Sequence, residues 1–369
     1  MDHKKRILVF SYAYYPYEGG AEIALREIAG RLPHIHFDIV TRRFSKKDIE
    51  KEENGNISVY RIRVFHKYLF PFLARRFGET LHKKYSYSVV WSIMANYAGF
   101  SALFFKRKHT NVKFLLTLQE GDSIEYIKNK VWFVYPWFSG IFREADHIQA
   151  ISKFLGTFAK EMGYKGKISI IPNGIREEFI VKDVSWPRRM PPFTLITTSR
   201  LVYKNAVDDI IRSLAHLPEH FRLHILGEGK ERKSLKKIVK KLALKKRVIF
   251  YGGVEYRDIP AYLYKADIFV RPSRSEGFGS SFIEAMAAGL PVVATAVGGI
   301  PDFIRDGETG FVCNVNDPKG IAEKILYIEK GDNISHVKEV VENAHALAKE
   351  RYLWNGIAQK MDTIFNTLF

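Results

Sequence analysis

The 369-residue sequence contains a single cysteine, Cys313, and no apolar stretch that reaches about 18 residues. One cysteine excludes an intrachain disulfide framework and a thiolate metal site, and it fits a reducing compartment. The first apolar run near the N-terminus is too short for a signal peptide or for a membrane span. We therefore expect a cytoplasmic protein, either free or peripheral on the inner face of a membrane.

Motifs for metal binding are also missing. The 12 histidines show no H-E-x-x-H or paired spacing, and no Asp-x-Asp pair of the kind that holds a metal–diphosphate complex occurs. We expect no metal and no cofactor.

Acidic residues are scarce, and the formal net charge is +18. Residues 61–113 hold 11 basic residues and 1 acidic residue, with aromatic residues interleaved in HKYLFPFLARRF (66–77). Such a face can bind an anionic membrane surface. Two other interpretations remain: a generally basic protein whose charge carries little information, and, less favoured by the pattern, nucleic acid as the partner. The basic block 230–247 has apolar residues at helical spacing, which predicts an amphipathic helix with a solvated face.

Short apolar strands alternate with helical stretches along the whole chain, and the length suggests two domains. This βα rhythm predicts parallel, doubly wound sheets. A linker-like segment, VSWPRRMPP (184–192) with Pro187, Pro191 and Pro192, marks the domain boundary. The strands are expected at 6–11, 37–41, 88–93, 113–118, 147–152, 167–175, 193–199, 222–227, 248–253, 267–272 and 291–295, and closing helices at 318–329, 335–350 and 352–368.

Two carboxylates, Glu276 and Glu284, flank a Gly-Phe-Gly loop between a predicted strand and a predicted helix. Backbone N–H groups at such a helix N-terminus favour phosphate, and ligands of open α/β sheets bind at the carboxyl ends of strands. Ionised carboxylates are strong acceptors for the hydroxyls of a sugar and a ribose. The pattern indicates a nucleotide-sugar site. For Glu284 an alternative stays open, because Ser281-x-x-Glu284 also fits a capping box.

Together with GGIPDFIRDGETGFV (298–312), this segment resembles the retaining glycosyltransferases of family 4, whose signature is the E-x7-E pair. The resemblance covers nearly the whole chain and is strongest from Arg200 to Val312. It implies the GT-B fold, with two Rossmann-like domains facing a central cleft. The expected domains are an acceptor domain at 1–183, a nucleotide-sugar domain at 184–350, and a last helix at 351–369 that returns to the first domain.

The resemblance implies transfer of a sugar from a nucleotide-diphosphate sugar to a glycan, a lipid-linked or another hydroxyl acceptor, in the synthesis of a cell-surface polysaccharide or glycolipid. Two alternatives are another GT-B activity, such as a nucleotide-sugar epimerase or hydrolase, and a non-catalytic protein that binds nucleotide sugars or glycans. Transfer to an added acceptor separates the first from a transferase, and binding without turnover identifies the second.

Arg200 and Lys204 follow a predicted strand in SRLVYKN. Negative charge grows on the departing diphosphate, and fixed cations at that oxygen stabilise the transition state. The family's phosphate-binding Arg and Lys match these positions, although they are four residues apart here and commonly five. The alternative is two ordinary surface cations. With Glu276, they form the expected catalytic set.

The remaining donor contacts are expected in loops at strand ends. Gly19 and Gly20 stand at the start of a predicted helix after the first strand, where they allow a phosphate to approach the backbone closely. The alternative is a flexible turn before a helix whose dipole is favoured by Glu22. The expected donor-binding residues are Gly19, Gly20, Gly227, Val254, Phe278, Gly279, Ser280 and Glu284, with Val254 near the base and main-chain amides acting near Phe278.

The sequence departs from the family in TLQEGD. Gln119 stands where family members often carry a histidine that contacts the transferred sugar. Glutamine can hydrogen-bond a hydroxyl but cannot act as a base near neutral pH. Gln119, Glu120 and Asp122 are the candidates for contact with the sugar or the acceptor, and the alternative for Glu120 and Asp122 is a turn or cap role.

Overall fold

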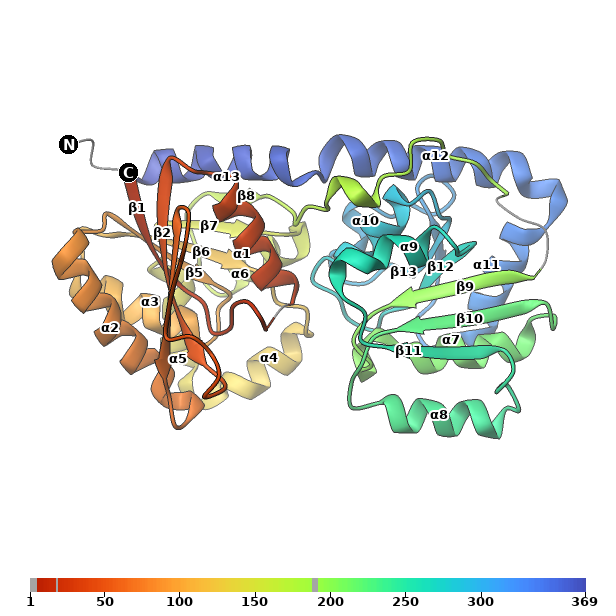
Figure 1. The fold of residues 1–369 in the computed structure, drawn as a ribbon, viewed down its shortest axis with the longest axis horizontal. Coiled ribbons are helices and arrows are strands. Elements are labelled where there is room, and N and C mark those ends of the chain that lie inside the picture. Colours follow the sequence, from red (N-terminus) through yellow and green to blue (C-terminus); the bar gives the residue numbers. More distant parts are fainter. Residues whose placement is uncertain (1–4, 18, 188–191) are drawn as a thin grey trace. The chain divides into compact units, whose positions relative to one another are not determined.

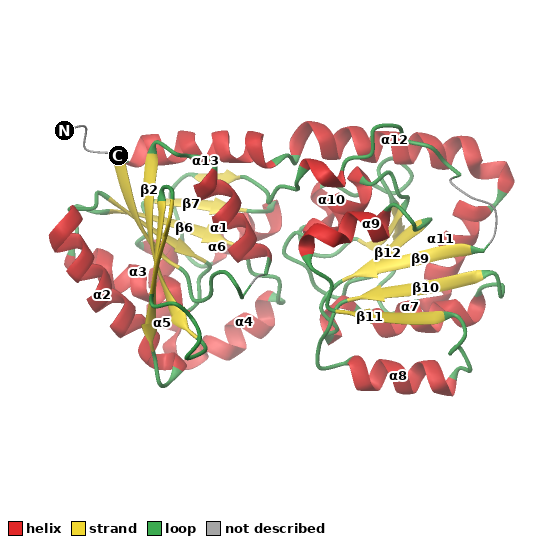
Figure 2. Ribbon diagram, viewed as in Figure 1, coloured by secondary structure: helices red, strands yellow, loops and turns green. Residues whose placement is uncertain are grey.

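The computed structural model describes residues 5–17, 19–187 and 192–369, and these form two compact units (Figure 1). The N-terminal unit runs to Gly174 and includes Trp354–Phe369, and the C-terminal unit is Ile175–Leu353. Each unit is a parallel α/β sheet with helices packed against it (Figure 2). The expected fold class, two Rossmann-like units, is confirmed.

The sheet of the N-terminal unit has eight strands in the order β3-β4-β2-β1-β5-β6-β7-β8. Neighbouring strands are parallel except for the antiparallel pair β3 and β4. The strands are β1 (Lys5–Phe10), β2 (Ile35–Arg43), β3 (Lys51–Asn54), β4 (Ile57–Arg63), β5 (Val89–Ile93), β6 (Lys113–Leu118), β7 (His147–Ala150) and β8 (Ile168–Ile170).

Helices cover this sheet. Helix α1 (Gly20–Gly30) packs against α13 (Trp354–Leu368), and both share a core with the strands. Helices α2 (Phe70–Tyr85) and α3 (Tyr97–Lys108) contact each other and the sheet, and α5 (Tyr135–Arg143) packs beside α3. Helices α4 (Ile124–Val131) and α6 (Lys153–Glu161) complete the unit.

The chain's last helix belongs to the N-terminal unit, as expected. Along α13 the buried residues recur at every third or fourth position, which gives one apolar face. The Phe365 ring packs against Trp91 and Phe37, with centroids 5.1 and 5.8 Å apart.

The sheet of the C-terminal unit is entirely parallel, in the order β11-β10-β9-β12-β13-β14. Its strands are β9 (Phe193–Thr198), β10 (Phe221–Leu226), β11 (Val248–Gly252), β12 (Ile268–Arg271), β13 (Val292–Thr295) and β14 (Phe311–Cys313). Its helices are α7 (Val207–Ser213), α8 (Arg232–Lys241), α9 (Ile259–Leu263), α10 (Ser280–Ala287), α11 (Pro318–Glu329) and α12 (Ile334–Arg351).

Helices α7, α8, α11 and α12 share one hydrophobic core with the strands, whereas α10 packs on β12 through a contact of the Phe282 and Phe269 rings. Leu235 and Val239 of α8 are buried in that core, so the basic block at 230–247 does form an amphipathic helix.

The C-terminal unit begins at Ile175, nine residues before the predicted boundary at 184. The Ile175 amide donates to the Tyr352 carbonyl at 2.6 Å, and the Val181 amide donates to the Ala287 carbonyl at 3.1 Å. These bonds and the buried Phe179 ring attach the segment to the C-terminal unit. The C-terminal unit ends at Leu353, three residues after the predicted end at 350. Of the predicted linker prolines, Pro191 lies outside the described residues.

Candidate functional site

The loops that follow neighbouring strands of the C-terminal sheet are joined by backbone hydrogen bonds. The Ser199 amide donates to the Leu226 carbonyl at 3.0 Å, and the Leu201 amide donates to the Glu228 carbonyl at 2.9 Å. The loop after β10 is joined in turn to the end of β11, because the Gly227 amide donates to the Gly252 carbonyl at 2.6 Å. The loops predicted to hold Arg200, Gly227 and Val254 therefore lie along one edge of one sheet.

Gly227 has a geometric reason to be glycine. Its φ is +137°, and a Cβ at this position would overlap the carbonyl oxygen of Ser199. Only a residue without a side chain lets the loop after β10 approach the loop that carries Arg200 this closely.

Glu276 is buried, and its carboxylate has two partners. One oxygen accepts a hydrogen bond from the Arg271 guanidinium, and the other accepts from the Gly277 amide at 3.1 Å. Each carboxylate oxygen offers about two lone-pair directions, so acceptor capacity remains for ligand hydroxyls.

The main chain of Glu276 is held by the loop after β13. The Gly299 amide donates to the Glu276 carbonyl at 3.1 Å. At Gly298, where φ is +57°, a Cβ would overlap the same carbonyl oxygen. Gly298 is a site residue that we did not single out from the sequence, although GGIP follows the predicted strand.

Arg271 and Asn205 connect Glu276 to the loop of Arg200. The Arg271 guanidinium donates to Asn205 Oδ1 at 3.1 Å and to Ser281 Oγ at 2.6 Å, while Asn205 Nδ2 donates to the Arg200 carbonyl at 2.7 Å. One chain of hydrogen bonds therefore runs from the Arg200 main chain to the Glu276 carboxylate. Neither residue was predicted from the sequence. Arg271 had a signal that could have identified it, because an arginine ends the buried strand in IFVR.

Arg274 fixes the turn that carries Lys204. The Arg274 amide donates to the Lys204 carbonyl at 2.7 Å, and its guanidinium pairs with Asp208 and Asp209 at 2.9 and 2.7 Å. The side chain of Arg200 is exposed and that of Lys204 is half-buried. Both predicted cations thus sit on a braced loop at the edge of the sheet.

Helix α10 begins without the predicted capping box. Its N-cap residue is Gly279, its first residue is Ser280, and no side chain caps its first amides. The Ser281 hydroxyl accepts from Arg271 instead, and Glu284 lies in the second turn of the helix. The capping-box alternative for Glu284 is therefore wrong, because the helix starts two residues too early for Ser281 to be its N-cap. An uncapped helix N-terminus keeps amides available for an anion.

Glu284 is buried beneath the loop that follows β11. Burial raises the pKa of its carboxyl to about 7, against the lowering effects of a hydrogen bond from the Tyr256 side chain and of the Arg271 charge. Val254, the residue expected near a base, is half-buried two residues before Tyr256. The Glu284 carboxyl and the predicted base loop are therefore linked through Tyr256.

Phe278 contributes only its main chain to this edge. Its ring is buried against the rings of Phe303 and Tyr352, with centroids 5.2 and 5.7 Å apart. The ring of Phe278 is thus used for packing, and binding by main-chain amides near Phe278 and Gly279 stays a prediction.

In the N-terminal unit, Gly19 is the N-cap residue of α1 and its amide donates to Glu22 Oε2 at 2.8 Å. Its backbone is extended, with φ −132° and ψ −176°, so the conformation does not require glycine at this position. Gly20 is the first residue of the helix. Within this unit Gly19 therefore forms the turn before α1, and its amide is bonded to the Glu22 side chain at the helix N-terminus, as in the second interpretation.

Gln119 and Glu120 also have partners in their own unit. Gln119 Oε1 accepts from Asn173 Nδ2 at 2.9 Å. Glu120 is buried, and its carboxylate accepts from the Ala95 amide at 2.6 Å and from the Gln119 amide at 2.9 Å. Burial raises the pKa of Glu120 to about 7, opposed by these amides and assisted by the Asp122 charge. Glu120 therefore braces a loop, while Asp122 is exposed.

Within the described ranges, no three His, Cys, Asp or Glu side chains lie together as a metal ion would need. Cys313 is buried, and burial raises the pKa of its thiol to about 12.

The sequence and the fold are both similar to those of known proteins. The sequence family described as Glycosyltransferase Family 4 matches residues 18–179, and the one described as Glycosyl transferases group 1 matches residues 181–347. An uncharacterized glycosyltransferase of Methanocaldococcus jannaschii is 26% identical over 361 residues, which span 96% of each chain.

Many solved structures share the fold, and two of them serve as examples. The sucrose-phosphate synthase of Thermosynechococcus elongatus superposes with a TM-score of 0.86 at 21% identity, covering 99% of each chain. Anabaena HepE, solved in complex with UDP-glucose, superposes with a TM-score of 0.80 at 20% identity, covering 98% of this chain and 99% of that one.

Proposed function

The chain belongs to glycosyltransferase family 4, and from this premise we propose that it moves a sugar from a nucleoside-diphosphate sugar to a hydroxyl acceptor with retention of anomeric configuration. The observation that carries the proposal is the hydrogen-bonded chain Arg200–Asn205–Arg271–Glu276. It couples a cationic loop to a carboxylate at the edge of one parallel sheet. The UDP-glucose held by the similar Anabaena HepE supports a nucleotide-sugar donor.

The roles follow from charge and position. Arg200 and Lys204 bind the diphosphate together with the uncapped amides of α10. Glu276 holds hydroxyls of the transferred sugar. Glu284 holds the ribose, and the loop of Val254 contacts the base.

Catalysis rests on the departing diphosphate. As the bond between the anomeric carbon and the phosphate oxygen breaks, its electron pair stays on that oxygen, where Arg200 and Lys204 stabilise the new charge. The acceptor oxygen bonds to the anomeric carbon on the face that the phosphate leaves, and its proton passes to the same phosphate oxygen. Because the phosphate oxygen takes the proton, this step needs no protein base, and it is compatible with Gln119, which cannot act as a base near neutral pH.

We also propose that turnover needs no divalent ion, because two side-chain cations and helix amides serve the diphosphate. The acceptor is a glycan or a lipid-linked hydroxyl, contacted by the N-terminal unit, in which Gln119 and Asp122 are the contact candidates. The protein acts in the cytoplasm, in the synthesis of a surface polysaccharide or glycolipid.

The test is transfer itself. Purified protein is incubated with UDP-, GDP- and ADP-sugars, a panel of sugar and lipid-linked acceptors, and EDTA, and the anomeric configuration of the product is read by NMR. Formation of an α-linked product from an α-linked donor in the presence of EDTA is expected. Donor hydrolysis or epimerisation without transfer would contradict the proposal, and an inverted product would contradict retention.

A further inference from the structure

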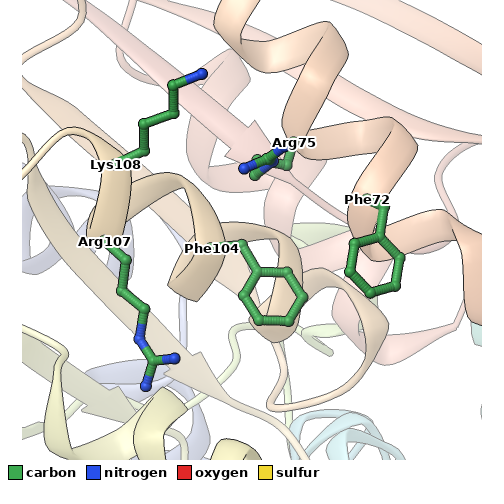
Figure 3. Close-up of a pocket in the computed structure, with 5 residues that line it drawn as sticks. All are labelled: Phe72, Arg75, Phe104, Arg107 and Lys108. Atoms are coloured by element: carbon green, nitrogen blue, oxygen red, sulfur yellow. The ribbon is translucent and has the colours of Figure 1, made fainter.

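A cavity of about 540 Å³ opens between α2 and α3 of the N-terminal unit. Phe72 and Arg75 line it from α2, and Phe104, Arg107 and Lys108 line it from α3 (Figure 3). The rings of Phe72 and Phe104 stack with centroids 5.3 Å apart and an interplanar angle of 20°. The cavity therefore combines an apolar side with three cationic side chains.

The cations of this cavity outnumber the carboxylates that pair with them. Arg107 pairs with Glu144 at 2.6 Å, while Lys108 and Arg75 share Glu79 at 2.8 and 3.5 Å. Three positive charges face two negative ones. The three cationic side chains are each partly exposed, at 33–55% of their surface, so an incoming phosphate can reach them and compete with the carboxylates.

Large apolar side chains are exposed along the chain next to the cavity residue Phe72. Phe72 itself is exposed, and Tyr68, Leu69 and Leu73 are exposed beside it at the start of α2. The nearby Phe65 is 80% exposed. A soluble protein rarely presents so many large apolar residues together unless the surface meets a partner or a membrane.

A second aromatic group lies where α4 meets α5, in the segment Tyr126–Trp137. Trp132 is 75% exposed, and Tyr126, Phe133 and Trp137 are also exposed. Helix α5 packs on α3, with the ring centroids of Phe138 and Phe100 6.4 Å apart, and α4 contacts α5. This group therefore lies in the same unit as the cavity, one helix away from α3. Exposed tryptophan and tyrosine beside lysine are typical of the membrane–water interface.

We propose that this face, formed by α2, α3, α4 and α5, docks the enzyme on an anionic phospholipid bilayer. The cavity takes a lipid phosphate between Arg75, Arg107 and Lys108, and the exposed aromatic side chains enter the headgroup layer. Two alternatives fit less well. A second copy of the chain would bring like charges together, and a nucleic acid would leave Phe65 and Trp132 without an apolar environment.

The test is co-sedimentation of the full chain with vesicles of phosphatidylcholine alone and of phosphatidylcholine with 30% phosphatidylglycerol, at physiological salt. We expect at least tenfold tighter binding to the anionic vesicles, weakening as salt rises. Replacing Arg75, Arg107 and Lys108 by glutamine should reduce this binding about fivefold per residue, because a cation near an anionic membrane is worth about 1 kcal/mol. W132A with F133A should weaken binding to both kinds of vesicle.

The matched control removes charge elsewhere. Lys236 and Lys240 on the basic helix α8 of the C-terminal unit are replaced by glutamine, and binding should stay within about twofold of wild type, since these residues lie outside the proposed face. Circular dichroism and thermal unfolding check that every variant is folded, and nucleotide binding by calorimetry separates this proposal from the donor site on the C-terminal unit. Equal binding to both vesicles, loss of binding in the α8 control, or self-association or RNA binding without vesicle binding would overturn the proposal.

Discussion

The two units share a parallel α/β architecture but use their candidate residues differently. In the C-terminal unit, Arg200 and Glu276 are linked through Asn205 and Arg271. In the N-terminal unit, Glu120 is bonded to nearby main-chain amides. A carboxylate linked through side chains to the main chain of a cationic loop at strand ends indicates a site, whereas a carboxylate bonded only to main-chain amides of its own unit indicates a structural brace.

The pKa values of Glu120 and Glu284 show the same difference between the two units. Burial raises the pKa of each to about 7. The surroundings differ, because Glu120 faces amides of Ala95 and Gln119 while Glu284 faces the Tyr256 side chain and the Arg271 charge. A raised pKa alone therefore does not tell a ligand-binding carboxylate from a structural one.

The largest expected effect comes from Arg200. Arg200→Ala should lower the transfer rate by about two to three orders of magnitude, by analogy with loss of one donor to a developing anion. Because the side chain is exposed, the melting temperature should change little. Arg222→Ala, at another exposed arginine of the same unit, is the control and should keep full activity. Wild-type turnover in Arg200→Ala would remove the residue from the mechanism.

Gly298→Ala should break the site through the backbone. The added Cβ meets the Glu276 carbonyl, and φ is positive, so we expect the free energy of unfolding to fall by about 2 kcal/mol and donor affinity to fall with it. Chemical denaturation and calorimetry measure both. Gly331→Ala, in the same unit with no atom near its Cβ, should be neutral in both measurements. A Gly298→Ala protein as stable and as active as wild type would show that the loop relaxes without moving Glu276.

Asn205→Ala removes the link between the Arg200 loop and Arg271. Loss of a buried hydrogen-bonding side chain should cost about 1–2 kcal/mol of stability. If Asn205 positions the catalytic loop, kcat should fall about tenfold while KM for the donor changes less. Loss of stability with unchanged kcat would give Asn205 a structural role only.

The pH dependence separates the two glutamates. Between about pH 4.5 and 7 the folded state holds protons on Glu120 and Glu284 that the unfolded state has lost, so the stability from each neutral carboxyl is complete below this window and is lost as pH rises through it. Urea unfolding at pH 5 and 8 should show this loss. Glu120→Gln and Glu284→Gln should each remove part of it, with a slope of up to about 1.4 kcal/mol per pH unit.

Only Glu284 should respond to nucleotide. If ribose hydroxyls donate to its carboxylate, binding at pH 6.5 should release a fraction of a proton, which calorimetry in buffers of different ionisation enthalpy detects. Glu120→Gln should keep this release, and Glu284→Gln should abolish it and weaken the nucleotide. Equal proton release in both variants would show that the ribose does not bind to the Glu284 carboxylate.

The smallest effect is expected at Asp122, which is exposed. Asp122→Ala should change the free energy of unfolding by less than about 0.5 kcal/mol and leave donor affinity unchanged. An increase in KM for the acceptor alone would identify it as an acceptor contact, whereas loss of donor binding would contradict the separation of roles between the units.

Local patterns predicted most of the fold. Strands such as β9 and β12 are continuous apolar runs, and α11 begins at a proline and matches its predicted bounds, 318–329. Three strands were missed. Two of them have no such signal, because β3 is the polar run Lys51–Asn54 and β14 has three residues. The third, β4 (Ile57–Arg63), is a buried strand whose apolar residues could have been recognised in the sequence ISVYRIR.

The site was predictable only in part. Glu276, Arg200 and Gly227 stand in loops whose position after a strand identifies them. Asn205 and Arg271 are 66 residues apart and act through a hydrogen bond to each other, and the partner of the Glu120 carboxylate, Ala95, is 25 residues away. Contacts between distant segments leave no local pattern in the sequence. Neither the Asn205–Arg271 hydrogen bond nor the bond from the Ala95 amide to Glu120 could therefore be inferred from composition or spacing.

The most direct test of the central claim, a nucleotide-sugar site assembled on the C-terminal unit, is calorimetric titration of the protein with UDP, GDP, ADP and their sugar conjugates, with and without EDTA. The account predicts micromolar binding of one nucleotide family that is insensitive to EDTA and is weakened in Arg200→Ala but not in Arg222→Ala. No binding by any nucleotide, or equal binding by both variants, would contradict it.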